Sequence, residues 1–188
     1  MENIFEIRDN VLERYNGINT GIVVPEGVTE IEDAFVGNKT IRSVTLPSTL
    51  RDVSAWIFEG CSALEKITIN ENNPYLKQHG QCIYTRDLSA LKLYPPYLKG
   101  TAFELPEFVK EIHPFAFCTS LLEKVICNRG LKKIDICAFS GCLTLNEITL
   151  PGTLTALGMY ALFAEPKAIS LEHHPNGAVT IRVLKNHE

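Results

Sequence analysis

The chain of 188 residues lacks the features that mark several common classes of protein. Its 18 basic and 22 acidic residues give a formal net charge of −4, and charges of both signs are scattered along the chain, so there is no basic stripe. Nucleic acid and anionic membrane surfaces are therefore poor candidate partners. No apolar run approaches the roughly 20 residues of a membrane-spanning helix, so we expect no membrane insertion.

Signatures of catalysis are also missing. The chain has no P-loop, no G-x-S-x-G, no H-E-x-x-H and no dinucleotide-binding fingerprint. His173 and His174 precede Pro175 in an expected loop, and His113 follows the apolar Ile112, so we expect its side chain to point outward. The prediction is a protein that is not an enzyme and has no cofactor or metal site, with an orphan enzyme as the remaining alternative.

No secretory signal is visible in the first twenty residues, because they contain six charged side chains: Glu2, Glu6, Arg8, Asp9, Glu13 and Arg14. Such a stretch has no apolar region of the kind that a signal peptide needs. The sequence as it stands predicts a cytoplasmic protein. The alternative is a cell-surface or secreted protein whose leader precedes Met1.

The chain does contain an internal repeat. One copy runs over Leu46–Ile69, with a proline after the first leucine, an apolar pair at Ile57-Phe58, a Gly-Cys step and an alternating strand at the end. Equivalent strands end at residues 24, 46, 69, 105, 127, 150 and 171, so the steps are 22, 23, 36, 22, 23 and 21 residues. A repeat of this length is typical of a solenoid.

We expect these strands to form one parallel ladder in chain order, with neighbours about 4.8 Å apart. The apolar spacing before each Gly-Cys step indicates one short helical turn that faces inward. Phe58, Phe117 and Phe139 hold the same position in their copies, and we expect them to stack as one buried column.

The repeat resembles the BspA-like branch of the leucine-rich repeats, whose unit is roughly I-P-x-x-V-x-x-I-x-x-x-A-F-x-G-C-x-x-L-x-x-I-x-L. The matching segments are Val24–Leu46, Leu46–Ile69, Leu105–Cys127 and Cys127–Leu150, followed by a degenerate copy over Leu150–Leu171. A hairpin motif of that family is matched at Asn72–Tyr75, Gly80–Tyr84 and Leu91–Pro96. The resemblance implies an α/β repeat solenoid: a right-handed superhelix with a parallel β-ladder, short helical turns on the convex side and an inserted β-hairpin.

The repeat divides the chain, and residues 1–188 are predicted to be a single leucine-rich repeat domain. Its expected parts are an N-terminal hairpin cap (1–21), repeats (22–69), a hairpin insertion with its turn at Asp87–Ser89 (70–102), repeats (103–171) and a C-terminal cap with a strand at 179–183 (172–188). A lone hairpin is marginal in water, so the insertion is expected to pack on the coils.

The six cysteines do not form a C-x-x-C motif. Cys61 and Cys142 share the Gly-Cys position, while Cys127 and Cys137 fill apolar positions, so we interpret them as small buried hydrophobes with free thiols. A disulfide and a metal site stay open as alternatives. Cys82, in the hairpin, is expected to be the most reactive thiol.

The outward side chains of the ladder are the candidate partner-binding residues: Thr45, Lys66, Thr68, Glu104, Lys124, Ile126, Glu147 and Thr149. Solenoids of this kind use such a face for partners, although β-branched residues also simply suit a strand. The predicted function is a non-enzymatic protein-binding module. We expect it to be a monomer with an unknown protein or glycan partner. The resemblance implies, as the alternative, a surface or secreted adhesin of the BspA-like type.

Overall fold

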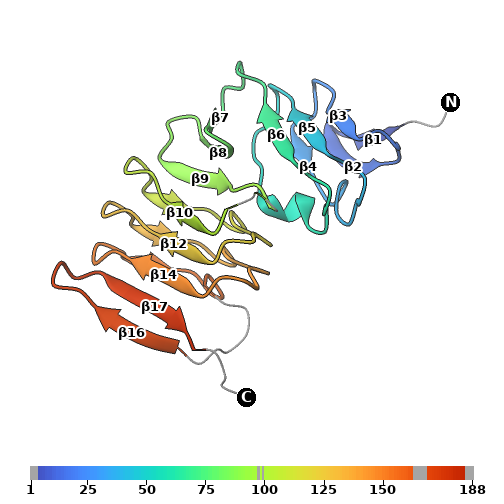
Figure 1. Cartoon of the computed structure of the whole chain (residues 1–188). Coiled ribbons are helices and arrows are strands. Elements are labelled where there is room, and N and C mark those ends of the chain that lie inside the picture. Colours follow the sequence, from blue (N-terminus) through green and yellow to red (C-terminus); the bar gives the residue numbers. More distant parts are fainter. Residues whose placement is uncertain (1–3, 97, 99, 163–168, 185–188) are drawn as a thin grey trace.

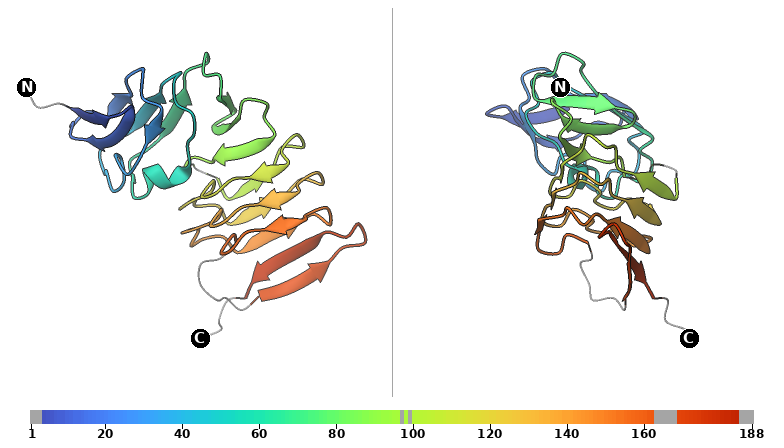
Figure 2. Two further views of the ribbon diagram at one scale, coloured as in Figure 1. Left: turned by 180° about the vertical axis from the view of Figure 1, so that it is seen from behind. Right: turned by 90° about the vertical axis from the view of Figure 1, so that its left-hand side faces the viewer.

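The structure is a computed structural model that describes residues 4–96, 98, 100–162 and 169–184. The chain forms an elongated stack of short strands with its two ends at opposite extremes (Figure 1). We call β1–β6 the first array and β9–β17 the second array; the hairpin β7–β8 lies between them (Figures 1 and 2).

The strands of the first array and the hairpin are β1 (Phe5–Arg8), β2 (Val11–Tyr15), β3 (Gly21–Val23), β4 (Glu30–Ile31), β5 (Ser43–Leu46), β6 (Lys66–Ile69), β7 (Leu76–His79) and β8 (Cys82–Thr85). Those of the second array are β9 (Ala90–Leu93), β10 (Ala102–Glu104), β11 (Glu111–Ile112), β12 (Lys124–Ile126), β13 (Lys133–Ile134), β14 (Glu147–Leu150), β15 (Ala156–Leu157), β16 (Ile169–His173) and β17 (Val179–Val183).

The N-terminal hairpin covers the first coil, as its alternating pattern predicts. Strands β1 and β2 pair antiparallel around Asp9 and Asn10, whose φ angles of 50° and 66° suit a tight hairpin turn. Strand β2 then pairs in parallel with β4, which places Leu12 opposite Ile31 and buries it completely. Ile7, on β1, remains 41% exposed, so it contributes little to this cover.

The predicted single ladder is wrong, because it is interrupted between β6 and β10. Strands β3, β5 and β6 form one parallel sheet, and β10, β12 and β14 begin another. At the free edge of β6, the side-chain amide of Gln78 donates from Nε2 to the Ile67 carbonyl (3.2 Å) and accepts from the Ile69 amide at Oε1 (3.3 Å). A glutamine side chain therefore occupies hydrogen-bonding groups that the next ladder strand would use.

The ladder also departs from chain order at its C-terminal end. Strand β17 pairs antiparallel with β14, and β16 pairs antiparallel with β17, so the strand that contains Leu171 is outermost (Figure 1). The expected capping strand at 179–183 is present. It is inserted between β14 and β16, where the periodic pattern had placed a direct parallel contact.

The short second strands of the coils form their own sheet, in the order β15-β13-β11-β9-β8-β7. Strand β9 pairs in parallel with β11, with Leu91 opposite Ile112, and antiparallel with β8 through the predicted turn. In that turn the amide of Leu88 (φ 66°) donates to the Thr85 carbonyl (2.8 Å). Strand β9 therefore occupies the position of a regular coil strand. The segment that departs from the repeat is residues 70–89, which is shorter than the predicted insertion of residues 70–102.

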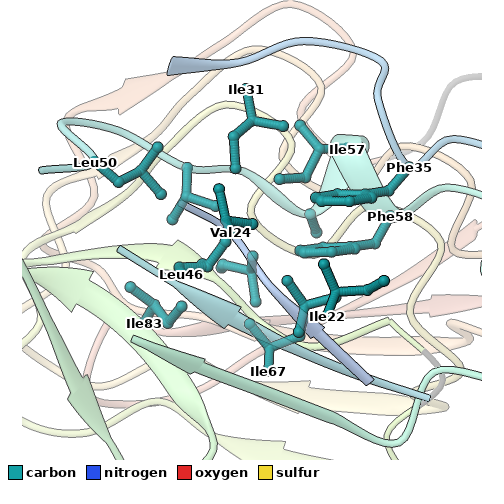
Figure 3. Close-up of a cluster of buried hydrophobic side chains, with 14 of the residues drawn as sticks. Ile22, Val24, Ile31, Phe35, Leu46, Leu50, Ile57, Phe58, Ile67 and Ile83 are labelled. Atoms are coloured by element: carbon teal, nitrogen blue, oxygen red, sulfur yellow. The ribbon is translucent and has the colours of Figure 1, made fainter. Parts of the chain in front are cut away.

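Two apolar cores replace the single expected column. In the first, the rings of Phe35 and Phe58 stack with centroids 5.7 Å apart (Figure 3). In the second, Phe117 stacks between Tyr94 (5.2 Å) and Phe139 (4.5 Å). Phe58 lies in the first array, and the hairpin separates it from Phe117. The ring of Tyr94 stacks on Phe117 at the place where the ring of Phe58 was expected.

The hairpin packs against both cores, as expected of a structural insertion. Ile83 joins the first core (Figure 3), whereas Tyr84 and Cys82 join the second. Alternate side chains of β8 therefore point into different arrays. Tyr75, just before β7, is 47% exposed and contributes little to this packing.

Among the described residues the only helix is a 3₁₀ turn, Ala55–Phe58, so the expected α/β character is corrected to a β-solenoid. The corresponding positions of later coils form non-helical turns with left-handed residues, at Phe115, Cys137 and Tyr160. One turn is too short to sustain a helix, and hydrogen bonds to the next coil replace the intrahelical ones. The Phe117 amide, for example, donates to the Ala138 carbonyl (2.9 Å).

Candidate partner-binding face

Three of the predicted face residues lie on the first array. The hydroxyls of Thr45 on β5 and Thr68 on β6 lie in register, 3.1 Å apart. Lys66 is exposed on the same face and borders a shallow groove of about 300 Å³ beside Gln78. These side chains belong to a sheet of three strands, and the groove beside Lys66 is lined by none of the other candidates.

The other five candidates meet on the second array. Glu104, Ile126 and Thr149 are in register on β10, β12 and β14. The row continues onto β17, where Thr180 lies opposite Thr149 with hydroxyls 2.9 Å apart. His174 fixes that end of the row, because its Nε2 lies 2.8 Å from the Thr180 hydroxyl.

A second row of the same face is a chain of alternating charges. Lys124 contacts Glu147 (2.7 Å), Glu147 accepts from Arg182 Nε (2.9 Å), and Arg182 reaches Glu172 (2.6 Å). The hydrogen bond from Lys124 lowers the pKa of Glu147, and the hydrogen bond from Arg182 lowers the pKa of Glu172. Exposed pairs contribute about 0–1 kcal/mol each to stability. Their main effect here is to hold an ordered row whose two positive and two negative charges cancel.

These rows border two hollows on the second array. One groove of about 670 Å³ is lined by Glu104, Ile126 and Thr149 together with the loop 176–178. An adjacent hollow of about 590 Å³ is lined by the charged row and shares Thr149 and the same loop. We call Glu104, Ile126, Thr149, the charged row and the loop 176–178 the second-ladder face.

Sequence reasoning missed part of the second-ladder face: Glu172, Thr180, Arg182 and the loop 176–178. The alternation of Val179, Ile181 and Val183 predicts the strand itself. Nothing in that pattern shows that the strand pairs with β14 in the antiparallel direction, which is what brings Thr180 beside Thr149.

Asn128 stands where other coils have a proline corner, and the structure gives it a structural role. Its Nδ2 donates to the carbonyls of Pro106 (2.6 Å) and Val109 (2.9 Å) in the preceding coil, and its Oδ1 accepts from the Gly130 amide (2.6 Å). Asn73 forms the same kind of bridge in the first array. A buried polar side chain is tolerated when it is hydrogen-bonded in this way.

No disulfide joins the cysteines of the described residues. Cys82 is 4% exposed, and burial raises the pKa of its thiol to about 12, so the expectation that it is the most reactive thiol is wrong. Burial likewise raises the pKa of Cys127 to about 12. Only Cys137 is partly exposed.

Among the described residues, no cluster of His, Cys, Asp or Glu side chains is arranged to hold a metal ion. The same part of the chain contains no helix that is long and apolar enough to cross a membrane. His113 does not point freely outward as expected. It is half-buried, with Nδ1 2.8 Å from Lys92 Nζ.

Coils of two short strands, a parallel ladder and stacked apolar residues define a repeat solenoid of the leucine-rich repeat class. The model of the BspA type leucine-rich repeat region matches residues 5–93 and 97–181 in six copies. The chain therefore belongs to the BspA-type leucine-rich repeat family.

Solved structures with the same fold include a leucine-rich repeat protein from Eubacterium ventriosum, at 23% identity and a TM-score of 0.62 over 73% of this chain and 40% of that one. The pneumococcal vaccine antigen PcpA matches at 19% identity and a TM-score of 0.60, over 76% of this chain and 47% of PcpA. The chain thus spans less than half the length of either. No curated protein sequence matches it.

Proposed function

We propose that this protein is a non-enzymatic repeat module that binds another protein through the second-ladder face. The observation that carries the proposal is the groove of about 670 Å³ whose floor crosses three consecutive ladder strands at Glu104, Ile126 and Thr149. Repeat solenoids commonly bind partners along such an extended concave surface.

The chemistry of the face favours an extended polypeptide segment. Ile126 contributes an apolar patch in the middle of the groove, and Thr149 and Asn176 add hydrogen-bonding groups at its side. The neighbouring charged row is internally neutralised, so it does not favour a strongly charged partner. Small pockets with a few polar groups and an apolar centre suit alternate side chains of an extended chain.

The two arrays offer a matched pair of variants for testing the proposal. Thr149→Glu and Thr68→Glu each add one carboxylate to a ladder position whose hydroxyl contacts a threonine on the neighbouring strand. Immobilised wild-type protein and both variants are incubated with extract of the native cell, and bound proteins are identified by mass spectrometry.

Thr149→Glu is expected to lose at least tenfold of a specific bound protein, while Thr68→Glu retains it. A purified copy of that protein must then bind directly, with the same ranking of the variants. Equal binding by Thr149→Glu, or selective loss with Thr68→Glu, would reject the second-ladder face. Turnover of a substrate by the purified module would reject the non-enzymatic assignment.

A further inference from the structure

The joint between the two arrays contains a polar cluster that the partner-binding face does not use. Lys92 of β9 is 7% exposed, and its ammonium group contacts the Asp52 carboxylate of the first array and His113 Nδ1 of the second array. A lysine this deeply buried needs such partners. The three side chains therefore connect the arrays through one buried cation.

A cleft of about 500 Å³ lies at the same joint, with one wall from each array. Ile31, Val53 and Ile57 belong to the wall of the first array, and Pro114 and Phe115 to the wall of the second. Across the joint, the ring of Trp56 lies 5.6 Å from the ring of Phe115. The arrays meet at this joint through this aromatic pair and the cluster around Lys92, and Leu93 and Cys118 of the second array are buried in the first core.

We infer that this joint is a pH-sensitive latch, in which protonation of His113 breaks its contact with Lys92 and loosens the two arrays. The hydrogen bond requires a neutral imidazole, because Lys92 has only donors and Nδ1 must supply a lone pair. A proton on Nδ1 removes that acceptor and places two cations 2.8 Å apart in a partly buried setting.

Charged side chains face the imidazole of His113 from every element packed around it. They are Lys92 on β9, Asp52 before the 3₁₀ turn, Glu111 on β11, Asp135 after β13 and Glu30 on β4. Lys133 in turn forms an ion pair with Asp135 (2.6 Å). The carboxylates oppose the effect of Lys92. Burial, followed by the Lys92 charge, nevertheless outweighs them and lowers the pKa of His113 below its ordinary 6.5.

The lowered pKa of His113 determines the pH range in which the latch holds. The unfolded or unlatched chain takes up the His113 proton at a higher pH than the latched form does. The latch is therefore fully engaged above about pH 6.5, and it is lost as the pH falls through the lowered pKa.

The single tryptophan of the chain, Trp56, reports on the joint directly. Its emission is recorded from pH 7.5 to pH 5, and the ring of His113 is titrated by NMR under the same conditions. The expected result is a red shift of the emission with the same midpoint as His113, below 6.5. His113→Gln abolishes the shift, whereas His173→Gln, which changes an exposed histidine, retains it.

Lys92→Met keeps the test decisive if His113→Gln does not fold. Removal of the cation takes away the contact that His113 protonation would break. The His113 midpoint should therefore move upward, while the Trp56 emission should show no transition at that midpoint. Two outcomes of the emission titration would overturn the latch: a wild-type emission that stays constant while His113 titrates, or a red shift that survives in His113→Gln. A His113 midpoint at or above 6.5 in the wild type would do the same.

Discussion

Thr119 is the residue whose replacement is expected to stabilise the protein most clearly. It lies two residues after Phe117, at the position that Gly37, Gly60 and Gly141 hold in other coils. All four residues have positive φ angles: 56° for Thr119 and 70–76° for the glycines. A β-branched residue is a marked outlier in this region, whereas glycine adopts it freely.

The conformation at Thr119 is imposed by the neighbouring coil. Its amide donates to the Ser140 carbonyl (2.8 Å), just as the Gly37 amide donates to the Glu59 carbonyl (2.7 Å). The Thr119 hydroxyl is buried and makes no hydrogen bond to any described residue. The side chain therefore gains little from its position while the backbone remains strained.

Thr119→Gly removes left-handed strain of about 1–2 kcal/mol and an unsatisfied hydroxyl whose burial costs about 1–3 kcal/mol. Against this stand the extra chain entropy of glycine, about 0.5–1 kcal/mol, and the lost methyl contact with Gly141. These terms leave about 1–4 kcal/mol before the methyl contact is subtracted. We take the lower part of that range, about 1–2 kcal/mol, as the expected gain in the free energy of unfolding. For a chain of this size, that corresponds to a melting temperature higher by roughly 2–8 °C.

Urea unfolding with an unchanged m-value measures this gain. Thr119→Asn should fall between the wild type and Thr119→Gly, because asparagine tolerates the left-handed region better than threonine. The reciprocal Gly141→Thr should destabilise, since a Cβ there meets the Thr119 methyl at 2.9 Å. If Thr119→Gly is no more stable than the wild type, the strain assigned to this turn is not present.

Three further predictions concern other parts of the coils. Asn128→Ala leaves the buried Val109 carbonyl without a donor, while the Pro106 carbonyl keeps the Val109 amide (3.0 Å). It should lower the free energy of unfolding by about 1–3 kcal/mol, whereas Asn72→Ala on the surface should change it by under about 0.5 kcal/mol. Phe117→Ala removes the middle ring of the second stack and should cost about 3–5 kcal/mol, seen as earlier loss of hydrogen-exchange protection in β12 and β14 than in β5. With a thiol reagent at pH 8, Cys137 should react first and Cys82 only after denaturant is added; rapid labelling of Cys82 would contradict its burial.

The periodicity of the sequence predicts where the strands lie better than it predicts which strands pair with each other. The positions of the strands, the N-terminal turn at Asp9-Asn10 and the turn at Asp87–Ser89 follow from local patterns. The break in the ladder does not, because it depends on the Gln78 side chain reaching the edge of β6. Thr149 was identified as a face residue for the same local reason, while its partner Thr180 comes from a strand whose pairing no local pattern specifies.

The hairpin explains how the solenoid can be interrupted without exposing an apolar end. An open solenoid end needs a cap, because its last coil has no neighbour to cover it. Strand β8 supplies a cap to both arrays at once, since Ile83 packs into the first core and Tyr84 into the second. Changes in the hairpin should therefore act on both cores together, whereas changes on the second-ladder face leave both cores intact, which is why Thr149→Glu can test binding separately from folding.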